Sequence, residues 1–307
     1  MVDRRKFLAL SLIGLYNTFV PSYSFSETIN PLQINKIIPK TGELLPSIGM
    51  GTWITFDIGY NTDEVNKRAE IVRNFFSNGG SLIDSSPMYG SAEKVLGLCL
   101  EKITEPKKLF SATKVWTPIN KHGEQQIENS YSLWKLNYFS LIQVHNLVNY
   151  KEHLKKLREL KEQKKLKYIG VTTSHGNKHK LLIDILNNED IDFVQFTYNV
   201  LDDEAEKILL PLAQEKKIAV IINRPFQGGS LFNHIIGKKI PTWLNSIGIH
   251  SWPEFFLKFI TSHPAVTCAI PATSRLDHMK ENMKSLFGNL PNIEERAKMK
   301  SLYKTYI

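Results

Sequence analysis

The 307-residue chain has a formal net charge of +9 at pH 7, with 42% hydrophobic and 22% charged residues. This balance is typical of a soluble globular protein, and the length allows one large barrel or two ordinary domains. The positive charge raises the alternative of a nucleic-acid surface. However, the Lys-rich run 151–167 places Leu154, Leu157 and Leu160 at helical spacing, and no aromatic side chains interleave to stack on bases. We interpret the run as the solvated face of a helix and expect no nucleic-acid partner.

The start of the chain differs from the rest. Arg4 and Arg5 are followed by Phe7, Leu8 and an apolar run that is too short to cross a bilayer. This is the layout of a signal peptide, and the paired arginines resemble the twin-arginine export signal, whose machinery moves folded proteins. One departure is Asp3, which stands where that signal usually has Ser or Thr.

The end of this leader is marked by small residues. Ser24 and Ser26 predict cleavage after Ser26, giving a signal peptide at 1–26 and a barrel domain at 27–307. We therefore expect a periplasmic or otherwise exported bacterial protein, with the twin-arginine export machinery as a partner and no stable membrane insertion. The alternatives are a retained membrane anchor and a chance basic start, and a leader that does not function would leave the protein in the cytoplasm.

Beyond the leader, strand-like and helix-like segments alternate along the chain. Each predicted strand is apolar enough to be buried on both faces and is followed by a helical pattern. The predicted strands are 44–53, 81–85, 108–116, 138–146, 167–173, 191–199, 218–226 and 266–272. The predicted helices are 62–80, 91–103, 122–136, the run 151–167, 178–188, 203–217, 252–263 and 274–287.

Eight such units in about 270 residues favour a single closed (β/α)8 barrel, the TIM barrel, over an open sheet. The earlier segment 32–46 does not belong to this count. It predicts a β-hairpin that turns at Thr41 and Gly42 and covers the bottom of the barrel. Cys99 and Cys268 lie in apolar segments and are expected in the core, with a disulfide as the alternative if the chain is exported. With no His pair at ligand spacing near either cysteine, we expect no metal site.

Polar residues end three consecutive predicted strands. Asp84, Lys114 and His145 follow one another at intervals of 30 and 31 residues, about one βα unit each, and Tyr89 lies in the turn after Asp84. Taken singly, each has a structural explanation as a cap, a solvent-reaching lysine or a core histidine. Chemistry in such barrels is located at the carboxyl ends of the strands, so their conjunction predicts an acid–base site.

The chemistry of these four side chains is complementary. A tyrosine with an ordinary pKa near ~10 needs a neighbouring cation to stabilise its phenolate, and Lys114 can supply that charge. Asp84 is available as the counter-ion of the buried ammonium. His145 can donate a hydrogen bond to a carbonyl oxygen. The set is suited to protonating an oxygen while another group delivers hydride.

Seven ordered stretches carry a resemblance to a known family. The chain is similar to the aldo-keto reductase superfamily in "GMGTW", "LIDSSPMYGSAEKVLG", "TKVW", "LIQVHN", "YIGVTTS", "VQFTYN" and "IPATSRLDHMKEN". The resemblance implies a catalytic tetrad of Asp84, Tyr89, Lys114 and His145, with Tyr89 as the general acid in carbonyl reduction. It also implies NADPH, with NADH as the alternative, bound across the barrel rim, and a small-molecule carbonyl substrate.

The resemblance implies further contacts. Trp53 and Trp116 match positions that line the family's substrate pocket, and the segment between Phe226 and Trp252 is expected to close it. The expected cofactor-binding residues are Gly51, Thr52, Thr172, Thr173, Gln195, Asn223, Arg224, Thr273, Arg275, His278, Glu281 and Asn282.

Three of the cofactor positions depart from the family's pattern. Thr173 stands where the family often has Asn, Asn223 where it often has a stacking aromatic, and His278 where an arginine often grips the 2′-phosphate. Arg275 is expected to substitute for that arginine, because a guanidinium binds phosphate well.

Two other functional classes are weighed against a reductase. The first is an exported nicotinamide-binding sensor or scaffold with little turnover, which the leader favours because free NADPH is not expected outside the cytoplasm. The second is a metal-dependent hydrolase, which is disfavoured because such sites need clustered His and carboxylate ligands. We expect a monomeric reductase.

Overall fold

The computed structural model describes residues 32–103 and 109–307. The leader predicted for 1–26, with Arg4, Arg5 and the cleavage site after Ser26, lies outside the described residues. In the described part of the chain, no helix has the length and apolar character needed to cross a membrane.

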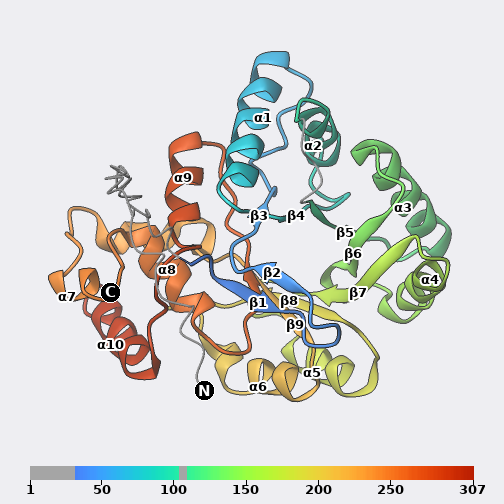
Figure 1. Ribbon diagram of the computed structural model, residues 1–307. Helices are drawn as coiled ribbons and strands as arrows, with labels where there is room; N and C mark the ends of the chain where they lie inside the picture. Colours follow the sequence, from blue (N-terminus) through green and yellow to red (C-terminus); the bar gives the residue numbers. More distant parts are fainter. Residues whose placement is uncertain (1–31, 104–108) are drawn as a thin grey trace, which may run out of the picture. The chain divides into compact units, whose positions relative to one another are not determined.

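Eight parallel strands form the centre of the domain (Figure 1), in the unbroken order β3 to β10. They are β3 (Met50–Gly51), β4 (Leu82–Asp84), β5 (Phe110–Val115), β6 (Phe139–Val144), β7 (Leu166–Thr172), β8 (Phe193–Thr197), β9 (Ala219–Asn223) and β10 (Cys268–Ala269). The sheet closes because Ile48 pairs with Ala269 and Gly51 with Ala272, both in parallel. The predicted (β/α)8 barrel is confirmed: each predicted range contains one barrel strand, except that β7 begins one residue before its range.

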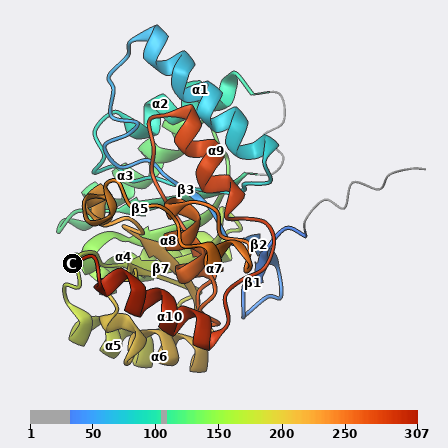
Figure 2. The same cartoon turned by 90° about the vertical axis from the view of Figure 1, so that its left-hand side faces the viewer.

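Helices surround the strands, as Figure 2 shows from the side. They are α1 (Thr62–Ser77), α2 (Ala92–Glu101), α3 (Asn120–Trp134), α4 (Tyr150–Glu162), α5 (His179–Asn188), α6 (Leu209–Glu215), α7 (Thr242–Asn245), α8 (Trp252–Thr261), α9 (Leu276–Lys284) and α10 (Ile293–Lys304). Short 3₁₀ segments are η2 (His145–Leu147), η3 (Glu204–Glu206) and η4 (Gln227–Ile235). In α4, Leu154, Leu157 and Leu160 are buried, as their spacing predicts.

Two helical regions differ from the prediction. The helix predicted over 203–217 divides into η3 and α6, and α6 begins two residues before Pro211. In the first turn of a helix the backbone N–H has no partner within the helix, so the missing N–H of proline costs little free energy there. A new helix can therefore begin just before Pro211. The predicted series ends at residue 287, whereas α10 follows it, started by a capping box between Asn292 and Glu295.

The hairpin is confirmed as the antiparallel pair β1 (Asn35–Ile37) and β2 (Leu44–Pro46). Its turn contains Gly42 at φ +75°, a left-handed conformation that suits glycine. Ile38 and Leu45 pack into the barrel interior against Phe110 and Phe193, the first residues of β5 and β8. The hairpin therefore covers the amino-terminal end of the barrel and leaves the carboxyl end open.

Cys99 and Cys268 are both buried and free. The core position predicted for them is confirmed, and the alternative of a disulfide between them is wrong because both are free: Cys99 packs in the layer around the barrel, where its thiol contacts the Val65 carbonyl, whereas Cys268 packs inside the barrel.

Candidate active site

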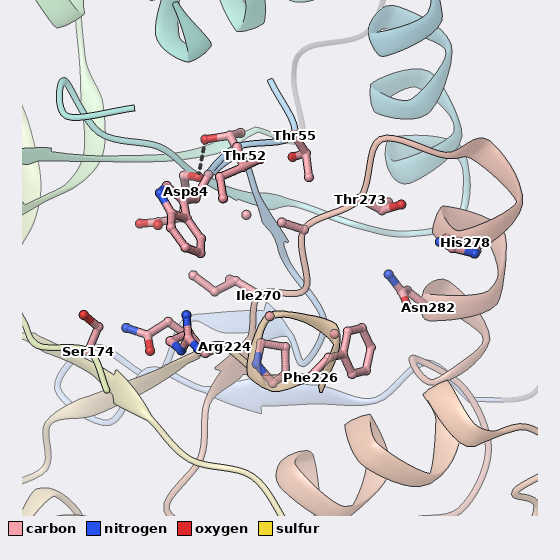
Figure 3. A pocket seen from close by; sticks show the side chains of 18 of the residues that line it. Thr52, Thr55, Asp84, Ser174, Arg224, Phe226, Ile270, Thr273, His278 and Asn282 are labelled. Atoms are coloured by element: carbon pink, nitrogen blue, oxygen red, sulfur yellow. Dashed lines mark hydrogen bonds between the residues drawn. The ribbon is translucent and has the colours of Figure 1, made fainter. Parts of the chain in front are cut away.

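The carboxyl ends of the strands surround a cavity of about 950 Å³. Figure 3 shows it from close by, with Asp84, Ser174 and Arg224 at one end and Thr273, His278 and Asn282 at the other. Asp84, Tyr89 and His145 line it directly, and Lys114 lies fully buried behind them. The four residues predicted from the strand ends and the following turn are thus brought together.

The alternation of side chains along each strand explains why these residues meet. On β5, Phe110 and Ala112 pack in the barrel interior, so the period of two directs Lys114 inward as well. On β4, Leu82 packs in the same interior cluster, which directs Asp84 inward. The polar side chains therefore form a layer above an apolar layer inside the barrel.

Asp84 and Lys114 form a buried ion pair. The Lys114 ammonium donates to Asp84 Oδ2 at 2.5 Å and to the Ser85 carbonyl at 2.7 Å. The amides of Gln143 and Gln195 each donate to Asp84 Oδ1 at 3.2 Å. Three donors on one carboxyl group favour the ionised form, and these extra hydrogen bonds offset the cost of removing both charges from water.

The pKa shifts in this pair have opposing causes. Burial raises the pKa of Asp84, and the Lys114 ammonium opposes that rise. Burial also disfavours the Lys114 ammonium, but Asp84 and Tyr89 outweigh it and raise the pKa of Lys114. Since Lys114 holds its proton and three donors saturate Asp84, we assign the pair as ionised at neutral pH.

Tyr89 lies against this ammonium. Lys114 Nζ is 5.1 Å from the centre of the Tyr89 ring and acts on the phenol through its positive charge. Burial nevertheless raises the pKa of Tyr89, while Lys114 opposes the rise. The phenol is therefore protonated at neutral pH, and a cation is in place to stabilise the phenolate once the proton has left.

His145 packs edge-on to the Tyr89 ring, with 5.7 Å between ring centres. Burial, together with the charge of Lys114, lowers the pKa of His145 to about 2, so its imidazole is neutral. Its Nδ1 lies 2.9 Å from Ser86 Oγ, which already accepts the backbone N–H of Met88. On this ground we assign the Ser86 hydrogen to Nδ1, which places the imidazole proton on Nε2.

Two residues of this layer, Gln143 and Ser86, were not predicted, and both bind the tetrad directly. Thr52, predicted as a cofactor contact, donates to the Asp84 carbonyl at 3.0 Å, the dashed line in Figure 3, and to Ser85 Oγ at 2.8 Å. A signal for Gln143 exists: on β6 it is two residues before His145 and two after the inward-facing Leu141. Ser86 has no such signal, because a serine after a strand is also an ordinary turn residue.

Most of the predicted cofactor-binding residues line the cavity. These are Gly51, Thr52, Thr172, Thr173, Gln195, Asn223, Arg224, Thr273, His278, Glu281 and Asn282. Arg275 is not among the lining residues: its guanidinium binds Asp277 at 2.5 Å, and both side chains are exposed. The structure therefore does not bring Arg275 to the cavity as a substitute for the arginine that His278 replaces.

The two predicted pocket tryptophans are placed differently. Trp53 lines the cavity. Trp116 is not among the lining residues. Its backbone is bound by Gln126 of α3, which accepts its N–H at 2.8 Å and donates to its carbonyl at 2.9 Å. The Trp116 side chain is 40% exposed.

The segment between Phe226 and Trp252 supplies much of the remaining wall, as expected. Phe226, Phe232, Ile240 and Trp252 line the cavity. Phe226 and Phe232 pack 5.1 Å apart, and both contact Phe256 of α8. This aromatic cluster anchors the segment to the barrel and gives the cavity an apolar side.

The floor of the cavity contains a polar group without a partner. Thr173 Oγ1 is buried and makes no hydrogen bond with any described residue. Next to it, Asn223 donates to the Thr173 carbonyl at 2.8 Å and accepts from Thr197 Oγ1 at 2.7 Å. A buried hydroxyl left unpaired costs free energy unless a ligand binds it.

Among residues 32–103 and 109–307, no group of three or more His, Cys, Asp or Glu is arranged to hold a metal ion.

Comparison with known proteins gives one family. The model of the Aldo/keto reductase family matches residues 47–304. Aldo-keto reductase YhdN of Bacillus subtilis is 26% identical over 200 residues, which cover 60% of this chain and 60% of that protein. The NADH-specific methylglyoxal reductase of Escherichia coli is 26% identical over 246 residues, covering 70% of this chain and 74% of that protein.

Solved structures share the fold. An aldo-keto reductase of Bacillus halodurans in its holo form superposes with a TM-score of 0.74 at 18% identity, covering 88% of this chain and 96% of that one. An aldo/keto reductase of Klebsiella pneumoniae in complex with NADP and acetate gives 0.73 at 22% identity, covering 87% and 94%.

Proposed function

The chain belongs to the aldo/keto reductase family, and we propose that it reduces an aldehyde or ketone to an alcohol with NADPH, NADH being the alternative cofactor. The observation that carries the proposal is the buried Asp84–Lys114 ion pair, whose ammonium lies against the phenol of Tyr89 at the cavity wall. A buried acid backed by a cation is what carbonyl protonation requires.

The cavity residues fit a nicotinamide cofactor. The unpaired hydroxyl of Thr173 and the amide of Gln195 offer polar partners for a carboxamide beside the tetrad. The far end of the cavity, with Thr273, His278 and Asn282, leaves room for the nucleotide portion (Figure 3). The Klebsiella pneumoniae neighbour contains NADP, whereas the Escherichia coli relative is named NADH-specific. The binding of NADPH and of NADH should therefore be compared directly.

Bound in the cavity, the nicotinamide would supply a hydride to the carbonyl carbon. Tyr89 transfers its phenolic proton to the carbonyl oxygen, and Lys114 then stabilises the phenolate that remains. The raised pKa of Tyr89 keeps the acid loaded at neutral pH before the transfer. Asp84 keeps Lys114 charged and in position.

His145 orients the substrate in this proposal. Its neutral ring, with the proton on Nε2, can donate to the carbonyl oxygen without adding a second positive charge beside Lys114. Such a donor stabilises the negative charge that develops on the oxygen in the transition state.

The test is Tyr89→Phe, which removes the acidic hydroxyl and keeps the ring that contacts His145. We expect kcat for aldehyde reduction to fall by roughly 10²- to 10⁴-fold, the usual share of a general acid, with the NADPH dissociation constant nearly unchanged. Turnover is followed by nicotinamide absorbance and binding by fluorescence titration. Tyr131→Phe, which removes a hydroxyl that binds the Lys165 carbonyl outside the cavity, is the matched control.

Unchanged turnover in Tyr89→Phe would contradict the acid assignment. Tight NADPH binding by the unsubstituted protein without reduction of any of a panel of carbonyls would favour the sensor or scaffold function instead.

Export belongs to the same proposal. The paired Arg4 and Arg5 of the leader support transport of the folded chain by the twin-arginine route. That route would let the protein carry a bound cofactor out of the cytoplasm.

A further inference from the structure

Arg224 is a cation in the cavity wall. It directly follows β9, and its half-buried side chain lines the cavity together with Trp53. The guanidinium carbon is 6.0 Å from the centre of a Trp53 ring, within the range of a cation–π contact. Figure 3 places Arg224 at the same end of the cavity as Asp84 and Ser174.

The guanidinium of Arg224 has no polar partner in the described residues: it makes no hydrogen bond and no ion pair there. The nearest acidic influence is Asp202, which acts on it only at a distance. A guanidinium has five N–H donors, and burying them partly without acceptors is costly. By contrast, the other arginines of the described barrel that are buried or half-buried are bound by carboxylates or carbonyls; these are Arg68, Arg158 and Arg296.

The backbone holds Arg224 in an unusual conformation. Its φ is +48°, in the left-handed region that non-glycine residues seldom adopt. The Arg224 carbonyl accepts from the Gln227 N–H at 2.9 Å and from the buried Asn199 amide at 3.4 Å, and these contacts keep the segment in place. Strain that the surrounding structure maintains in this way is concentrated at binding sites.

The charged groups that line the cavity include more than one cation. Besides Arg224, Lys238 is among the lining residues. Of the two carboxylates that line the cavity, Asp84 is saturated by Lys114 and two amides, and Glu281 belongs to α9. Figure 3 shows that α9, with His278 and Asn282, lies across the cavity from Arg224. Among the described residues, no carboxylate that lines the cavity therefore pairs with Arg224, and Asp202, which acts on it from a distance, does not line the cavity.

Resting on the proposed function, we propose that the substrate is an acidic aldehyde or ketone, and that Arg224 binds its carboxylate while Tyr89 and His145 bind its carbonyl oxygen. A planar guanidinium matches a carboxylate with two parallel N–H···O bonds, which fixes orientation as well as affinity. Trp53, Phe226 and Phe232 would enclose the apolar part between the two polar groups.

The resemblance to the family implies a different partner for Arg224, namely the cofactor. The two assignments differ in measurable ways. If Arg224 binds substrate, its loss raises KM for acidic carbonyls alone; if it binds cofactor, its loss weakens NADPH binding and slows every substrate equally.

The experiment compares 4-carboxybenzaldehyde with its neutral methyl ester in the unsubstituted protein, Arg224→Gln and Arg224→Lys. For the acid, we expect kcat/KM of Arg224→Gln to fall roughly 10- to 100-fold, because the loss of a charge-assisted hydrogen-bonded pair raises KM. For the ester, we expect kcat/KM to change less than about twofold. Arg224→Lys keeps the positive charge but cannot form two parallel hydrogen bonds to a carboxylate. Its kcat/KM for the acid should therefore lie between those of Arg224→Gln and the unsubstituted protein. Lys94→Gln removes an exposed charge that lies outside the cavity and controls for net charge.

A second measurement separates this inference from the proposed function. 4-(Hydroxymethyl)benzoate and its methyl ester are titrated calorimetrically into the NADP+-loaded protein and into Arg224→Gln. Binding of the acid that depends on Arg224 supports the inference even if neither aldehyde is reduced, an outcome that would count against the reductase function alone. Equal losses for acid and ester, or weakened NADPH binding with the preference for the acid retained, would overturn it.

Discussion

His145 shows how much of this site depends on a single hydroxyl. The neutral imidazole carries one N–H proton, and it can donate to the substrate only in the tautomer with that proton on Nε2. Ser86, through its contact with Nδ1, selects that arrangement, while Lys114 and burial keep the ring neutral. Ser86 is therefore a positioning residue, since it acts on the substrate only through His145.

Ser86→Ala should therefore lower kcat by roughly fivefold, the value of about one hydrogen bond, with NADPH binding unchanged. Nitrogen NMR of the labelled imidazole should show both tautomers of His145 where the unsubstituted protein shows one. Ser85→Ala removes the neighbouring hydroxyl, which binds Thr52 instead, and should leave the tautomer signal as it was. A single tautomer retained in Ser86→Ala would argue against the positioning role.

At this scale, the sequence predicts residues that stand out against their surroundings. Asp84, Lys114 and His145 are polar groups at the ends of apolar strands, and this contrast alone places them at the carboxyl rim. It cannot indicate that Arg275 binds Asp277, or that Trp116 lies outside the cavity lining, because both depend on tertiary contacts that short patterns do not encode.

Among the elements, α2 is tied to its neighbours by one buried carboxylate. Glu93 accepts from Thr113 Oγ1 at 2.5 Å, Ser130 Oγ at 3.0 Å and Trp134 Nε1 at 3.0 Å, which connects α2 to β5 and α3. Thr113 faces outward on β5 while the next residue, Lys114, faces the site. The contact therefore fixes the strand that supplies the catalytic ammonium.

Replacing Glu93 with alanine should lower the free energy of unfolding by about 3 kcal/mol, because three buried donors lose their acceptor. Urea denaturation followed by circular dichroism measures the change. Glu128→Ala, an exposed acid on α3, is the control and should stay within about 0.5 kcal/mol of the unsubstituted protein. Equal effects of the two substitutions would show that the Glu93 contacts do not stabilise the fold.

The regular elements followed from hydrophobic periodicity, whereas the cavity-closing segment did not. Between Phe226 and Trp252 the chain forms two short helices, η4 and α7. Phe232 of η4 packs against Phe256 of α8, which stabilises the segment. Gly228 and Gly229, both at positive φ, interrupt any helical period there. A segment whose conformation depends on tertiary contacts leaves no periodic signal to read.

For the molecule as a whole, the proposal of folded export gives a test that needs no substrate. Replacing both Arg4 and Arg5 with lysine keeps the charge of the leader and removes the paired arginines. We expect the protein to accumulate in the cytoplasm of a bacterial host, measured by cell fractionation, since the export receptor reads the motif and not the charge. Continued export of the lysine variant through the route for unfolded chains would contradict the twin-arginine proposal.

The closure of the barrel between its first and last strands also sets the order of events during synthesis. β3 gains its second neighbour only when the backbone around Ala269 and Ala272 arrives, near the end of the chain. Until then a growing polypeptide presents an unpaired strand edge, the feature that invites association with other chains. The barrel therefore cannot close before the segment around Ala272 has been synthesised, and we expect the exposed edge of β3 to need protection from aggregation until then.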